Sequence, residues 1–117
     1  MRLKFENFGH AERYLKVCKR VLVEHISGPD GARLGRERIR NAFCQGFGFS
    51  HYPEMQYILK ALKIPEATNS EEELSLAFRK GFTRALEVAA EQGFTIAHSP
   101  EILAAIAVNR VLEWSPA

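Results

Sequence analysis

The sequence holds few of the residues that proteins use for cross-links and for membrane spans. Its two cysteines, Cys18 and Cys44, have a spacing that fits neither a disulfide framework nor a zinc motif. No apolar run approaches the ~20 residues needed to cross a bilayer, and the first ten residues carry charge where a secretory signal has an apolar core. These absences indicate a cytoplasmic protein with reduced, buried thiols and no membrane partner.

Catalytic and metal-binding motifs are absent as well. The sequence has no Walker-type loop, no strand-associated glycine fingerprint, no His-Glu-x-x-His and no paired Cys-x-x-Cys. Cys18 and His25 are two helical turns apart, about 10 Å along a helix axis, which is too far to share a metal or a proton. They could act only if the fold brought in His51, Cys44 or His98. We therefore expect no enzyme activity, no metal and no cofactor.

The composition is that of one ordinary globular domain covering residues 1–117, because 46% of the residues are hydrophobic and 26% are charged. The net charge of +2 hides an uneven split. Residues 1–63 hold 12 Lys and Arg against 6 Asp and Glu, whereas residues 64–117 hold 4 against 8. Such polarity suits an anionic partner at the basic end, head-to-tail contact between copies, or solubility alone.

Apolar residues recur at intervals of three and four through most of the chain, which predicts an all-α, bundle-like domain. Ser70 with Glu73 forms a capping-box pattern, Gly93 fits the position after a helix end, and Ser99-Pro100-Glu101 is typical of a helix start. We expect the last two helices to form the central pair, and residues 1–9 to dock through Phe5 and Phe8. The predicted helices cover residues 10–26, 33–45, 52–63, 70–92 and 100–114.

The stretch NAFCQGFGFSHYPEMQYIL, residues 41–59, crowds aromatic residues and two glycines between two predicted helices. Gly46 and Gly48 supply the backbone freedom of a sharp reversal, and the phenylalanines around them predict a turn folded into the core. Ser50 is a plausible N-cap for the next helix, whose first turn tolerates Pro53.

Gly46-Phe47-Gly48-Phe49 resembles the glycine-hydrophobe-glycine turn of the helix-hairpin-helix family. The resemblance covers about twenty residues and implies that backbone amides at a helix start hold a DNA phosphate. A helix-turn-helix register, with Ala42 at the packing position and Gly46 at the turn, is a related alternative. A structural turn that closes over Phe43, Phe47 and Phe49 is the remaining interpretation.

The most basic stretch lies just before this turn, where Arg33, Arg36, Arg38 and Arg40 surround Glu37. Arg33, Arg36 and Arg40, with the amides near Gly46 and Gly48, could bind phosphates. The alternative is a solvated helix face with local Arg and Glu pairing.

The helix predicted over 100–114 is apolar on nearly every side, which indicates a central helix or one that faces a partner chain. We therefore expect a homodimer through this helix or the adjoining face of 70–92. The function favoured is a small non-enzymatic adaptor that self-associates, and the alternative is a weak nucleic-acid-binding protein that uses its basic half. The predicted interface residues are Ile102, Leu103, Ile106, Val108, Val111, Leu112 and Trp114.

Overall fold

The computed structural model describes residues 1–29 and 33–113. Over these residues it confirms an all-α fold of five helices, with two very short strands that the sequence did not predict. Strand β1 includes Ile26, which was predicted as the end of the first helix, and β2 lies in a predicted connector. The two strands pair antiparallel, with Ile26 opposite Ile96. The elements are α1 Phe8–Glu24, β1 Ile26–Ser27, α2 Arg36–Phe47, α3 Tyr52–Ala61, α4 Glu71–Glu91, β2 Thr95–Ile96 and α5 Pro100–Glu113.

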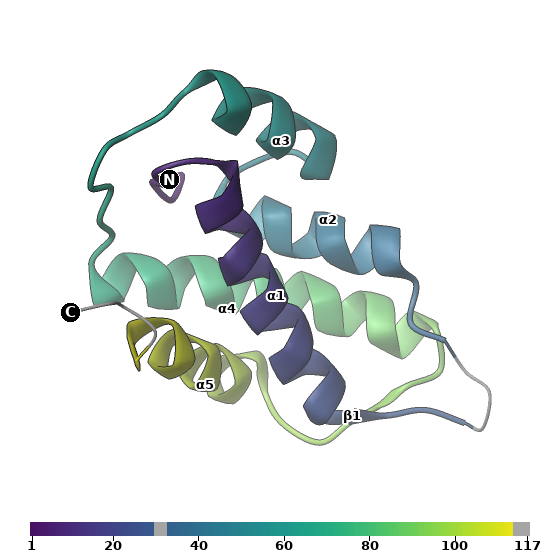
Figure 1. The fold of residues 1–117 in the computed structure, drawn as a ribbon. Helices are drawn as coiled ribbons and strands as arrows, with labels where there is room; N and C mark the ends of the chain where they lie inside the picture. The colour runs from purple at the N-terminus through teal and green to yellow at the C-terminus, as the bar shows by residue number, and fades with distance from the viewer. Residues whose placement is uncertain (30–32, 114–117) are drawn as a thin grey trace.

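Helix α4 is the centre of the fold (Figure 1). Helices α2 and α5 flank it, α1 lies over the group and contacts α2 and α5, and α3 covers one end of α1 and α2. The predicted central pair was α4 with α5, but α4 packs more extensively against α2. The difference arises because two glycines let the axes of α2 and α4 approach closely.

Gly46 is one of these glycines, and the sequence placed it wrongly in the turn. It lies inside α2, where a Cβ atom would fall 2.4 Å from the nitrogen of Gly81 on α4. Gly48 does make the reversal, with φ of +103°, a region that residues with a Cβ enter at a cost. The Phe49 amide donates to Cys44 O at 3.0 Å and so closes the helix end.

Several helix ends follow the local signals. The capping box of Ser70 and Glu73 is formed, the Ser99 hydroxyl accepts from the Ile102 amide, and Gly93 has φ of +88°. The Phe94 amide donates to Ala89 O at 3.0 Å, as expected for a glycine-terminated helix. Local chemistry therefore sets both ends of α4 and the start of α5.

Other ends were wrong by a few residues. Helix α1 begins at Phe8 because Asn7 Oδ1 accepts from the His10 amide at 2.9 Å. Helix α2 begins at Arg36 rather than 33, after Gly35, whose amide donates to Gln92 Oε1 at 2.8 Å. Helix α3 is capped by His51, not by Ser50, because His51 Nδ1 accepts from the Glu54 amide at 3.1 Å. Its end lies at Ala61 rather than 63.

The N-terminal segment docks on the helices through Leu3 and Phe5, both buried. The Leu3 amide donates to Phe47 O at 2.9 Å, and the Phe5 ring packs edge-on against Tyr14. Phe8, the second predicted anchor, is half-buried in the first turn of α1. No helix among the described residues is long and apolar enough to cross a membrane.

Candidate nucleic-acid interface

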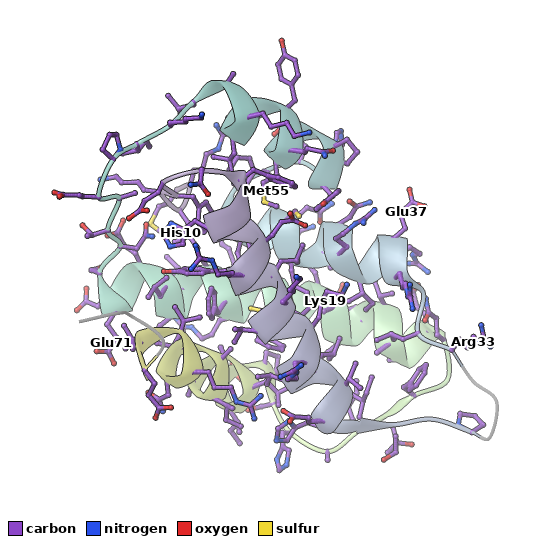
Figure 2. All side chains as sticks on the ribbon, viewed as in Figure 1. His10, Lys19, Arg33, Glu37, Met55 and Glu71 are labelled. Atoms are coloured by element: carbon purple, nitrogen blue, oxygen red, sulfur yellow. The ribbon has the colours of Figure 1, made fainter. Side chains whose placement is uncertain are left out.

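Basic side chains from two helices gather on one side of the molecule. On α1, Lys16 is followed by Lys19 and Arg20 at helical spacings of three and four, and α1 packs against α2. Lys19 leaves α1 on the side of α2 (Figure 2), where Arg36 and Arg40 stand one helical turn apart. We call Lys16, Lys19, Arg20, Arg36 and Arg40 the basic face.

The charges of the basic face act on one another. The pKa of Lys19 is lowered, first by partial burial and then by the positive charges of Arg40, Arg36 and Lys16. In the described part of the chain, none of the five side chains forms an ion pair or a hydrogen bond to a protein group. Three arginines elsewhere do form ion pairs: Arg2 with Glu54, Arg38 with Glu91 and Arg110 with Glu24. Among residues 1–29 and 33–113, these five charges therefore have no carboxylate partner.

A hollow of about 760 Å³ continues the basic face along α1 toward α5. Val17 and three members of the basic face, Lys16, Lys19 and Arg20, line its α1 side. At the end of α1, Glu24 pairs with Arg110 of α5 at 2.6 Å, and Glu113 of α5 also lines the hollow. The cationic end of the hollow is thus separate from its neutralised end.

Arg40 is held more firmly than the other four side chains. Its guanidinium carbon lies 3.9 Å from the ring centroid of Tyr52, the first residue of α3, in a cation–π contact. The Tyr52 hydroxyl donates to Glu12 Oε2 at 3.2 Å, and the Tyr52 amide donates to Asn41 Oδ1 at 2.8 Å. Burial, followed by the Glu12 carboxylate, raises the pKa of Tyr52, so the phenol stays protonated as a donor.

The three arginines predicted to bind phosphate do not act as one group. Arg36 and Arg40 lie together on α2, but Arg33 lies in the loop before the helix, at the far tip of the molecule (Figure 2). The physical reason is the later start of α2, which takes Arg33 off the helical face. Arg38, also on α2, is engaged by Glu91 at 2.6 Å.

The glycine turn is closed to an anion by the chain itself. The Gly48 and Phe49 amides bond to carbonyls of α2, and the Ser50 amide donates to Glu54 Oε1 at 3.0 Å. The Tyr52 amide is bonded to Asn41 as described above, and Gly46 is buried against α4. The phosphate site implied by the helix-hairpin-helix resemblance is therefore filled by protein groups.

Some residues of the predicted dimer surface are buried within the chain, and others are exposed. Leu103, Val108 and Val111 are buried within the chain's own core, and Ile106 is half-buried against it. Ile102 and Leu112 are exposed, by 49% and 41%. Trp114 lies outside the described residues.

The two thiols are buried, and two of the imidazoles lie side by side. Cys18 and Cys44 are both buried; burial raises the pKa of Cys18 well above its usual value and that of Cys44 to about 12. His25 and His98 approach each other edge to face, with ring centroids 5.3 Å apart. Over residues 1–29 and 33–113, no three His, Cys, Asp or Glu side chains converge as metal ligands do.

Sequence reasoning missed the α1 members of the basic face. Lys16, Lys19 and Arg20 follow a helical spacing that was visible, but nothing local indicated that this side of α1 would adjoin Arg36 and Arg40 on α2.

The chain matches no protein-family model, no curated protein and no solved structure. Its function is therefore inferred from the arrangement of its own residues.

Proposed function

We propose that the protein is a non-enzymatic binding module that holds the phosphate backbone of duplex nucleic acid on its basic face. The observation that supports this proposal is the gathering of five cations from α1 and α2 that have no ion-pair partner among the described residues, close enough for three of them to lower the pKa of Lys19. Like charges at neighbouring helical positions destabilise a helix and repel across an interface, so a polyanion relieves a cost of the free protein. This ranks nucleic acid above the adaptor that the sequence favoured.

A duplex fits better than a single strand. Proteins that bind single strands need aromatic rings free to stack on bases, and the ring beside the basic face, Tyr52, is covered by Arg40. Lys and Arg side chains of this kind contact phosphates and carry little sequence information. We therefore expect weak binding, with dissociation constants of roughly 10⁻⁴ to 10⁻⁶ M at physiological salt, and nearly equal affinity for all sequences.

The cytoplasm, where thiols stay reduced, is the proposed location.

The test is fluorescence anisotropy of a labelled random-sequence duplex, titrated with the full chain near 50 mM salt. The double variant Lys16→Glu, Arg20→Glu reverses two exposed charges of the basic face that form no ion pair or side-chain hydrogen bond in the described part of the chain. We expect at least a tenfold loss of affinity for every duplex tested. A flat trace for the unaltered protein would refute the proposal.

The matched control is Arg79→Glu, Lys80→Glu, which makes the same change of net charge on α4. These two side chains line a different hollow, together with Glu87 and Glu101. The control should bind duplex nearly as well as the unaltered protein. If both double variants lose the same affinity, general charge attraction explains the binding and the basic face is not the site.

Self-association through α5 is a second candidate, supported by the exposed Ile102 and Leu112. Burial of Leu103, Val108 and Val111 leaves this surface smaller than the sequence suggested. Sedimentation velocity at tens of micromolar tests it: a dimer that Ile102→Glu with Leu112→Glu dissociates would support self-association, and a monomer would remove it.

A further inference from the structure

We propose that Arg40 is the centre of a discrete phosphate subsite, with Lys19 and Arg36 as the other cations and Tyr52 as the residue that positions Arg40. The inference rests on the proposed function, since the phosphate would be one of the nucleic-acid backbone. It adds that the basic face is not a uniform charged surface, because one of its side chains is held in place before the ligand arrives.

The positioning of Arg40 comes from three elements. Tyr52 at the start of α3 lies under the guanidinium, with the centroid 3.9 Å from Arg40 Cζ. Tyr52 is held at both ends. Its hydroxyl donates to Glu12 Oε2 of α1 at 3.2 Å, and its backbone amide donates to Asn41 Oδ1 of α2 at 2.8 Å. A guanidinium stacked in this way loses less side-chain entropy on binding than a free one.

One polar atom of Arg40 is left in an unfavourable state. Arg40 Nε is buried and has no hydrogen-bond partner. In the described part of the chain it is the one buried side-chain nitrogen or oxygen without such a partner. Native proteins pair nearly all such atoms, so an exception calls for an explanation. With Nε enclosed, the terminal guanidinium nitrogens are the atoms that can meet a ligand, in the forked geometry that suits two phosphate oxygens.

The surrounding charges favour an anion at this point. Arg36 precedes Arg40 by one helical turn, and Lys19 reaches α2 from the neighbouring helix. The Glu12 carboxylate is engaged at the edge of the ring, where it accepts the Tyr52 hydroxyl, and Glu37 lies on α2 between Arg36 and Arg40. A phosphate oxygen therefore meets three positive side chains, and its charge offsets their mutual repulsion.

The subsite predicts that Arg40 serves binding at the expense of stability. Arg40→Met keeps an apolar stem on the Tyr52 ring while it removes the unpartnered Nε and one of the repelling charges. Without ligand, this variant should unfold at the same temperature as the unaltered chain or higher. An arginine with a purely structural role would instead lower the unfolding temperature when replaced.

The probe is inorganic phosphate, compared with chloride at equal ionic strength, with thermal unfolding as the readout. Phosphate should raise the unfolding temperature of the unaltered chain, and Arg40→Met should lose this rise. General stabilisation by phosphate through exclusion from the surface would raise both proteins equally and would overturn the subsite. Lys60→Met is the matched control, since Lys60 also lies over a ring, Phe8, at 5.9 Å, but is not a member of the basic face. It should keep the full rise.

The role of Tyr52 is tested by a conservative pair. Tyr52→Phe keeps the ring under Arg40 and should retain most of the phosphate response, whereas Tyr52→Leu removes the ring face and should reduce it severalfold. Equal losses in both would contradict positioning by the ring.

Duplex titrations separate this inference from the proposed function. Duplex binding that Arg40→Met weakens tenfold supports both. Duplex binding that is unchanged in Arg40→Met keeps the proposed function and overturns the subsite. No duplex binding, together with a phosphate response that depends on Arg40, overturns the proposed function and keeps a phosphate site.

Discussion

Gly46 of α2 and Gly81 of α4 meet backbone to backbone, with no side chain between the two helices at that point. A Cβ atom on Gly46 would lie 2.4 Å from Gly81 N and 2.7 Å from Ala77 O. Because both obstacles are main-chain atoms, no rotamer change relieves the overlap. The contact joins the helix that carries Arg36 and Arg40 to the centre of the fold, so it also positions these two members of the basic face.

Gly46→Ala should therefore be strongly destabilising, at or above the upper end of the roughly 1–3 kcal/mol typical of overpacked cores. Gly81→Ala is the matched comparison, because a Cβ atom there meets a side-chain carbon of Phe43 at 3.0 Å. A small ring movement and the better helix propensity of alanine should keep that variant within about 1 kcal/mol of the unaltered protein. Urea unfolding of both variants measures the difference, and equal losses would contradict this account of the crossing.

The two thiols should be inert in the folded protein. Burial raises the pKa of Cys44 to about 12 and that of Cys18 well above its usual value, so neither forms the reactive thiolate at pH 8. A colorimetric disulfide reagent at pH 8 should label neither cysteine in native protein and both in denaturant. Rapid labelling of one cysteine under native conditions would show an opening that the structure does not contain.

The same thiols make stability fall at alkaline pH. In the unfolded chain a thiol loses its proton near the ordinary pKa of 9.0, whereas folded Cys44 keeps its proton to about 12. Between these values the folded state binds more protons, so the free energy of unfolding decreases as the pH rises above 9. Cys44→Ala should lower stability at pH 7 but flatten this alkaline decline. An equally steep decline in the variant would assign it to other groups.

The capping box at the start of α4 makes stability depend on pH in the opposite direction. The Ser70 amide, which donates to Glu73 Oε1 at 2.9 Å, lowers the pKa of Glu73 below 4.5. The stabilisation is therefore present above pH 4.5 and is lost as the pH falls through the lowered value. Glu73→Gln keeps a neutral acceptor, so the unaltered chain should be more stable than this variant at pH 7, with the difference shrinking at pH 3. Thermal unfolding at the two pH values checks it.

How far the sequence predicted the fold depended on the range of the interaction. Ser70, Gly93 and Ser99 act on amides and carbonyls a few residues away, and their predictions were confirmed. Gly35 was missed as the boundary of α2 because its partner, Gln92, is 57 residues away. Gly46 was misassigned because a glycine that permits a turn and one that permits close helix packing look the same in sequence.

The candidate site shows the same division. Arg36 and Arg40 could be proposed from the composition of one helix, and they do share a face. Lys16 and Lys19 could not be joined to them, because the packing of α1 on α2 depends on contacts between distant segments. The α5 face was overestimated because periodicity does not say which apolar sides, such as those of Val108 and Val111, face the chain's own core.

The central claim, that the basic face binds duplex phosphates, is tested most directly by the salt dependence of duplex affinity. Each phosphate contact contributes about −0.9 to the slope of the logarithm of the association constant against the logarithm of salt concentration. If all five cations neutralise phosphates, that slope should be about −4.5. Lys16→Glu with Arg20→Glu should make that slope shallower by about 2, and Arg79→Glu with Lys80→Glu should leave it unchanged. A slope that does not respond to the first pair, or that responds equally to both pairs, would contradict the account.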